Sequence, residues 1–289
     1  MQIGVHGLVF TGQFDEQGLV TAASGAQQAG FDLLELPLMN PYTFDGPLVQ
    51  RIADDHNLAV TASLGLDADH DLTSDDPATR QRGRDLLHRA VDVVAEAGGA
   101  HLCGVLYSAM RKYMHPATPQ GLEYSATIIS ELGEYARTSG VQVSLEVVNR
   151  YETNVFNTGR GALQFLQSVT SNNVAVHLDT YHMNIEESGL YQPVIDTATQ
   201  LRYVHIGESH RGYLGTGTVD FGSFFRALAA INYSGPVVFE SFSSAVVSEA
   251  LSNTLGIWRN LWNDSADLAA HANRFIRDHI RAVDTIAMH

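Results

Sequence analysis

The sequence predicts a (β/α)8 barrel, because eight short apolar runs alternate with eight segments of helical character. Each run together with the helix that follows it takes roughly 25–40 residues, which is the size of one strand–helix unit. We found no linker or low-complexity stretch inside residues 1–289, so we expect a single domain. A doubly wound sheet is the rival architecture, but the G-x-G-x-x-G fingerprint after its first strand is missing.

The predicted strands are about four to eight residues long and rich in β-branched or other apolar residues, as buried parallel strands are. In chain order they are Ile3–Leu8, Phe31–Leu36, Leu58–Leu64, His101–Leu106, Val141–Val148, Val174–Leu178, Leu201–Ile206 and Pro236–Phe239.

The helices between these strands have recognisable ends. Asp76-Pro77 and Thr118-Pro119 each combine an N-cap residue with a proline in the first turn, and Gly30 and Gly140 each follow a helical segment as C-terminal stops. The predicted helices are Glu16–Ala29, Asp45–His56, Pro77–Ala97, Pro119–Ser139, Arg160–Val169, Gln192–Gln200, Phe221–Ile231 and a C-terminal region from Ser248.

Composition excludes several classes of function. The net charge of -15 opposes binding to nucleic acid or to an anionic membrane surface. A single cysteine, Cys103, rules out an intramolecular disulfide and a zinc site built from cysteines, and its apolar surroundings favour a buried side chain. The N-terminal MQIGVHGLVF lacks the features of a signal peptide, and no apolar run has the length of a membrane span, so we expect a cytoplasmic protein.

Polar residues occupy the ends of the last four predicted strands, at Glu146, Asp179, His205 and Glu240. In this barrel the C-terminal strand ends form the active site, and neighbouring strands bring their last residues together. Isolated polar residues solvated in loops are the alternative, but four successive strands favour a shared divalent ion. Three carboxylates and one imidazole suit Mn²⁺ or Mg²⁺, with Co²⁺ tolerated.

Two glutamates at one ion also suggest proton transfer at a sugar carbon. Glu146 or Glu240 could remove a proton next to a carbonyl group, with the metal stabilising the resulting cis-enediolate. The other glutamate could return a proton on the opposite face, which would invert the stereocentre. Spacing alone does not establish that the two carboxylates face each other.

Three blocks of sequence resemble the ketose 3-epimerases of the D-tagatose 3-epimerase family: SLEVVNRYETNVFN (144–157), HLDTYHMNIEE (177–187) and HIGESHRGYLGTG (205–217). The resemblance extends over nearly the whole chain and looks closest to the D-allulose (D-psicose) and L-ribulose members. It implies a barrel of the sugar isomerase type, one divalent ion that is usually Mn²⁺ and in some members Mg²⁺ or Co²⁺, and a homo-oligomer, either a dimer or a tetramer. It also implies reversible C3 epimerisation of free ketoses such as D-fructose/D-allulose, L-ribulose/L-xylulose and D-tagatose/D-sorbose.

The resemblance also implies roles for individual residues. Glu146 and Glu240 match the two catalytic glutamates, and together with Asp179 and His205 they match the metal ligands. The matches to polar substrate contacts are Glu152, His182 and Arg211. The matches to the sugar's wall are His6, Gly65, Tyr107, Met110 and Phe242, where His6 and Gly65 depart from residues that other members carry.

Several other polar residues have less specific surroundings. We interpret Gly215-Thr216-Gly217 as a turn rather than a phosphate loop, and Glu208 and His210 as neighbours of the site rather than ligands. His177 is expected to pack beneath the ion, while the sequence does not decide whether Glu35 bonds near the site. The region 248–262, with two tryptophans, suits either a core helix or a subunit interface.

Three other functions remain open on the residues alone. An aldose–ketose isomerase or an inosose dehydratase would use the same barrel, and product analysis would distinguish them. A DNA-repair endonuclease would need a basic groove, which the net charge of -15 opposes. A sugar-binding protein without activity would not need two carboxylates at its metal.

Overall fold

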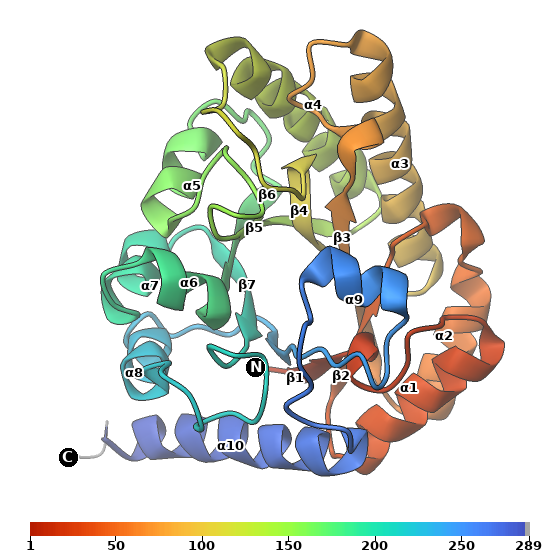
Figure 1. The fold of residues 1–289 in the computed structure, drawn as a ribbon, viewed down its shortest axis with the longest axis vertical. Helices are drawn as coiled ribbons and strands as arrows, with labels where there is room; N and C mark the ends of the chain where they lie inside the picture. Colours follow the sequence, from red (N-terminus) through yellow and green to blue (C-terminus); the bar gives the residue numbers. More distant parts are fainter. Residues whose placement is uncertain (287–289) are drawn as a thin grey trace.

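The computed structural model describes residues 1–286, in which eight parallel strands close into a barrel in chain order, with β8 paired back to β1 (Figure 1). This confirms the predicted (β/α)8 class. The strands are β1 (Ile3–His6), β2 (Leu33–Pro37), β3 (Ala59–Leu66), β4 (His101–Ala109), β5 (Gln142–Val147), β6 (Val174–Asp179), β7 (Leu201–Ile206) and β8 (Val237–Phe239).

The helices surround the strands on the outside of the barrel, except the short helix Glu249–Leu255, which is drawn in front of the strands (Figure 1). They are α1 (Glu16–Gln28), α2 (Gly46–Asp55), α3 (Pro77–Glu96), α4 (Pro119–Thr138), α5 (Gly159–Leu166), α6 (Thr180–Glu186), α7 (Tyr191–Thr197), α8 (Phe221–Ala230), α9 (Glu249–Leu255) and α10 (Ser265–Ile286). Short 3-10 turns occur at Gly7–Val9, Pro41–Thr43 and Ala68–His70. Helix α10 contacts α8, α1 and β1, and so completes the ring of helices.

The predicted helix ends agree with the capping contacts. Asp76 caps α3 by accepting the amides of Ala78 and Thr79, and the Thr118 side chain accepts the Gly121 amide at the start of α4. Gly30 and Gly140 adopt the left-handed conformation, with φ of 82° and 72°. At these positions glycine avoids the steric penalty of a Cβ atom, so each helix stops there.

Seven of the eight strands differ from their predicted bounds by one to three residues at an end, and two of these differences have clear local reasons. The second begins at Leu33 rather than Phe31, because the Phe31 amide bonds to the Ala26 carbonyl at 3.0 Å and closes the end of α1. The first ends at His6, whose Nδ1 accepts the Leu8 amide at 3.3 Å and starts the 3-10 turn.

Helix α6 was not predicted, and it follows β6 without a loop. Asp179 is both the last residue of β6 and the N-cap of α6, where its Oδ1 accepts the Tyr181 amide at 2.8 Å. This immediate strand-to-helix turn places His182 one helical turn beyond Asp179, on the same side.

The barrel interior is unusually polar for a buried space. The main apolar core lies between strands and helices, whereas a small cluster of Leu33, Cys103, Tyr203 and Val238 fills the inside. Polar side chains continue this interior toward the C-terminal strand ends, and Glu35, His177 and His205 are each 0 % exposed. Buried polar groups need partners, so this layer is a place to look for function.

Among the described residues, no helix is long and apolar enough to cross a membrane.

Candidate metal centre and sugar site

Four residues from consecutive strands meet at the C-terminal end of the barrel. Each of Glu146, Asp179, His205 and Glu240 offers one ligand atom, and these four atoms lie within 4.8 Å of one another. All four residues are buried. Asp179 and His205 are directly paired in the register of β6 and β7, and Glu240 follows the end of β8. The structure therefore brings together all four residues for which the sequence suggested a shared ion.

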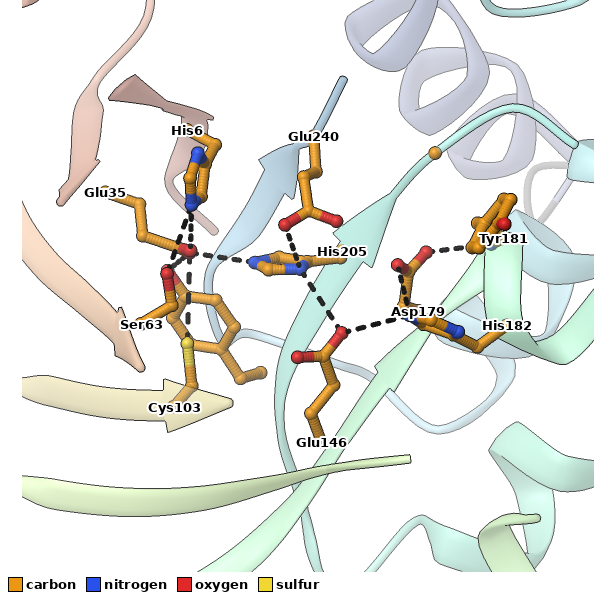
Figure 2. A network of polar contacts seen from close by, with 12 residues as sticks. His6, Glu35, Ser63, Cys103, Glu146, Asp179, Tyr181, His182, His205 and Glu240 are labelled. Atoms are coloured by element: carbon orange, nitrogen blue, oxygen red, sulfur yellow. Dashed lines mark hydrogen bonds and ion pairs between the residues drawn. The ribbon is translucent and has the colours of Figure 1, made fainter. Parts of the chain in front are cut away.

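The two glutamates approach His205 from different directions. The Nδ1 atom of His205 lies 3.8 Å from Glu146 Oε1 and 3.6 Å from Glu240 Oε1. Figure 2 shows Glu240 and Glu146 on opposite sides of the His205 ring, with their carboxylates pointing inward. This arrangement leaves a carboxylate on each side of a common centre.

Burial and neighbouring charges change the pKa values of three cluster residues in different directions. Burial, followed by the charges of Glu240 and Asp179, raises the pKa of Glu146 well above its usual value, although His205 opposes this. Burial also disfavours ionised Asp179, but the charges of Arg211, His182 and His205 lower its pKa to about 2. Burial likewise disfavours charged His205, yet Glu35 and Glu240 raise its pKa to about 10.

The donor set fits a hard divalent cation. The His205 Nδ1 atom is buried, and within residues 1–286 it has no hydrogen-bond partner. Three carboxylates surround this atom and repel each other, so a bound cation would both accept the lone pair and balance the charge. Oxygen donors with a single imidazole match Mn²⁺ or Mg²⁺ better than a structural zinc site.

Arg211 lies beside the cluster and bonds to two of its carboxylates. Its Nη1 atom is 2.7 Å from Glu240 Oε2 and 3.1 Å from Asp179 Oδ2, and its guanidinium lies 3.8 Å over the Tyr181 ring. The residue has φ of 59°, an unfavourable left-handed conformation for a side chain of this size. The Ser241 hydroxyl donates to the Arg211 carbonyl and helps to hold this turn.

His182 and Glu152 are fixed by a shared asparagine. The Nδ1 atom of His182 lies 3.1 Å from the Asn149 amide and 2.9 Å from the Asn149 side-chain nitrogen, which is also 2.9 Å from Glu152 Oε1. With Nδ1 accepting, the proton is on Nε2. This atom lies 3.7 Å from Glu146 Oε1 and 3.6 Å from Asp179 Oδ2. The sequence reasoning missed Asn149, although its place immediately after the fifth strand was a signal.

The proposed wall residues have different surroundings. The His6 and Phe242 rings pack edge to face with centroids 5.8 Å apart, and a Cβ atom at Gly65 would lie 3.0 Å from the Met110 sulfur. Tyr107 is 0 % exposed and stacks on Phe156 in the core. The Tyr107 hydroxyl also donates to the Glu146 carbonyl at 2.8 Å, so Tyr107 supports the backbone of a cluster residue, and its place in the sugar wall stays a prediction.

A cavity of about 430 Å³ leads to the cluster. Glu152, Arg211 and Phe242 line its inner part, and residues 255–259 at the end of α9 line its outer part. Part of the tryptophan-rich region 248–262 is therefore a rim of the site, with Trp258 77 % exposed, and Trp262 is buried.

The remaining polar signals have structural explanations. Glu208 is 1 % exposed and accepts the amides of Ser209, Gly215 and Val219, so it organises the Gly-Thr-Gly loop as a turn. His210 lies at the cavity rim. His177 packs edge to face on His205, with ring centroids 4.2 Å apart. Cys103 is fully buried.

Comparisons with known proteins agree with this architecture. Residues 24–279 match the family model of the xylose isomerase-like TIM barrel. The chain is 57 % identical to a ketose 3-epimerase of Arthrobacter globiformis over 289 residues, which cover 100 % of both chains. It is 50 % identical over 277 residues to an L-ribulose 3-epimerase of Methylomonas sp. (strain DH-1), covering 96 % of this chain and 97 % of the relative. A crystal structure of a D-allulose 3-epimerase from Methylomonas sp. in complex with D-allulose has a TM-score of 0.95 at 49 % identity, with 96 % and 97 % covered.

Proposed function

We propose that this chain, which belongs to the ketose 3-epimerases of the xylose isomerase-like TIM barrel family, inverts C3 of free ketoses by proton transfer between two glutamates. The class of activity follows from the family: the protein is a carbohydrate epimerase, and so an isomerase. The names of its relatives point to L-ribulose and D-allulose as substrates. The candidate pairs are D-fructose/D-allulose, L-ribulose/L-xylulose and D-tagatose/D-sorbose.

The placement of Glu146 and Glu240 carries the mechanistic part of the proposal. Their carboxylates lie on opposite sides of the His205 ring (Figure 2), so a ketose bound between them would present one face of C3 to each. One carboxylate removes the C3 proton to give a cis-enediolate, and the other delivers a proton to the opposite face. Reversing the two roles gives the reverse reaction.

Three further side chains would hold the sugar. The Arg211 guanidinium and the Nε2–H of His182 are donors directed at the cluster, suited to the oxygens on C1 and C2. Glu152 at the cavity would accept from a sugar hydroxyl. The side chains of His6 and Phe242 would form the apolar wall on the remaining side.

We also propose that Glu146, Asp179, His205 and Glu240 hold one divalent ion, Mn²⁺ or Mg²⁺ with Co²⁺ as a possible substitute. When bound, such an ion supplies positive charge beside the oxygens next to C3. A single-domain cytoplasmic enzyme that assembles as a dimer or tetramer stays a prediction, and light scattering would measure the assembly.

A matrix of metals and ketoses with product identification tests this function. Protein stripped with a chelator is reloaded with Mn²⁺, Mg²⁺ or Co²⁺ and incubated with each candidate ketose. We expect a second ketose as product, and activity that depends on the metal. An aldose product would indicate an aldose–ketose isomerase, and loss of water would indicate a dehydratase. No turnover with any pair would refute the proposal.

A further inference from the structure

The buried layer beneath the metal centre contains a carboxylate that the proposed chemistry does not use. Glu35, in the middle of β2, is 0 % exposed and points into the barrel toward His205 (Figure 2). Its Oε2 atom lies 2.9 Å from His205 Nε2 and 2.6 Å from the Tyr203 hydroxyl. An ionised carboxylate accepts hydrogen bonds and cannot donate them, so both neighbours are donors.

These contacts fix the proton of the His205 ring. If Nε2 donates to Glu35, a neutral ring keeps its lone pair on Nδ1, the atom that faces Glu146 and Glu240. In the opposite tautomer, the proton on Nδ1 would point toward the ion. The Nε2 lone pair would then face the Glu35 carboxylate, so that two acceptors would lie against each other. The ring is also packed from another direction by His177, at 4.2 Å between centroids.

Glu35 is itself held by a chain of hydroxyl groups. Because the Tyr203 hydroxyl donates to Glu35, it must accept from the Thr61 hydroxyl, which lies 2.6 Å away. Thr61 is on β3 and Tyr203 on β7, so this chain crosses the barrel. The second oxygen of Glu35 lies 3.5 Å from His6 Nε2.

We propose that Glu35, supported by the Tyr203 hydroxyl, is a positioning residue that sets the tautomer and orientation of His205 for metal binding. Carboxylates that hold metal-bound histidines in this way typically change metal affinity 10- to 100-fold when removed. Glu35 is 0 % exposed and contacts the cluster at His205, so it acts through that ring. This inference rests on the proposed metal site.

Calorimetric titration of metal-free protein with Mn²⁺ tests the role of Glu35. We expect Glu35→Gln to bind Mn²⁺ roughly 10- to 100-fold more weakly than the wild type, because its amide can present a donor to His205. Unchanged affinity in a folded Glu35→Gln variant would overturn the inference. Wild-type protein that binds no Mn²⁺ would instead overturn the proposed metal site, so the two failures are distinguishable.

A second variant covers the possibility that Glu35→Gln does not fold. Tyr203→Phe keeps the carboxylate but removes one of its donors, and we expect a loss of Mn²⁺ affinity of about 3- to 10-fold. Tyr233→Phe is the matched control, since Tyr233 is also buried and, within residues 1–286, its hydroxyl bonds only to the Pro236 carbonyl. Equal Mn²⁺ affinity in both tyrosine variants would overturn the proposed support of Glu35.

Nitrogen NMR of histidine-labelled protein reports the tautomer of His205, which would not change if Glu35 had only a structural role. The His205 signals are assigned by comparison with His205→Asn. In the metal-loaded wild type we expect a protonated Nε2 and a metal-shifted Nδ1, and in Glu35→Gln a mixture of tautomers. Identical His205 signals in the two proteins would contradict the proposal.

Discussion

Replacing Arg211 with methionine should separate the electrostatic balance of the site from its chemistry. The guanidinium bonds to Glu240 and to Asp179, which is 0 % exposed. Removing one partner of a buried ion pair costs about 3–5 kcal/mol, because the remaining charge stays buried. For a protein of this size we expect the melting temperature of the metal-free form to fall by roughly 10 °C.

Metal should recover part of this loss. Arg211 and a bound cation would both neutralise Glu240 and Asp179. Without the arginine, the negative charge of these carboxylates is less compensated, and they attract a cation more strongly. Each tenfold gain in Mn²⁺ affinity adds about 1.4 kcal/mol of stability at saturating metal. We therefore expect Mn²⁺ to raise the melting temperature more in Arg211→Met than in the wild type, while turnover falls about 10²- to 10³-fold.

Differential scanning calorimetry with and without Mn²⁺ measures both effects. The matched control is Arg51→Met, which removes an exposed pair between α2 and α1, in which Arg51 lies 3.1 Å from Glu16. Exposed pairs contribute about 0–1 kcal/mol, so this control should change little in either state. If Arg211→Met lost equal stability with and without Mn²⁺, the reasoning that the arginine and the ion share carboxylates would be refuted.

Three further predictions concern acid stability, sugar binding and the fold. Burial lowers the pKa of His101 from 6.5 to about 4, so below about pH 6.5 the unfolded chain binds a proton that the folded protein does not, and the free energy of unfolding falls. Urea unfolding at pH 5 should show that the wild type has lost about 2 kcal/mol relative to pH 7 and that His101→Leu avoids this loss. Parallel pH curves for the two proteins would contradict this. Glu152→Gln should lower kcat/KM about 10- to 100-fold, because it weakens the hydrogen bond to the sugar, while the affinity for Mn²⁺ stays unchanged. An equal loss of Mn²⁺ affinity would instead place Glu152 at the metal. Gly104→Ala should destabilise the protein by more than about 2 kcal/mol, because φ is 117° and the new Cβ atom would lie 2.3 Å from the Leu64 carbonyl oxygen. An unchanged melting temperature would contradict this and would show that the backbone of β4 shifts to accept the methyl group.

The barrel and the convergence of its polar residues were predictable because both follow from periodic patterns. Apolar runs mark the strands, and parallel strands in one barrel must end on one face, so Glu146, Asp179, His205 and Glu240 had to be neighbours. The pattern does not specify distances or hydrogen-bond partners. These depend on strand register, which gives Asp179 and His205 their direct pairing.

Local irregularities explain what the sequence could not predict. The sequence could not show how the Tyr107 ring packs, because the pairing of β3 with β4 shifts between residues 65 and 66, and Gly104 has φ of 117°. Strict alternation therefore fails along β4, and the Tyr107 ring enters the core. Helix α6 was missed because one side chain, that of Asp179, both ends the strand and caps the helix.

The role of Glu35 depends on depth within the barrel. Alternation along a strand shows which face a side chain takes, but the face alone does not show what lies opposite. Only the closed sheet brings Glu35 of β2 within 2.9 Å of His205 on β7.

The most direct test of the central claim is the fate of hydrogen at C3 in deuterated water. The metal-loaded protein is incubated with the ketose that it converts, and proton and carbon NMR follow C3 of substrate and product at early times. Transfer between two glutamates predicts deuterium at C3 of the new ketose, little in the remaining substrate, and almost no turnover in Glu240→Gln. A product that retains its original hydrogen at C3, or full activity in Glu240→Gln, would contradict the account.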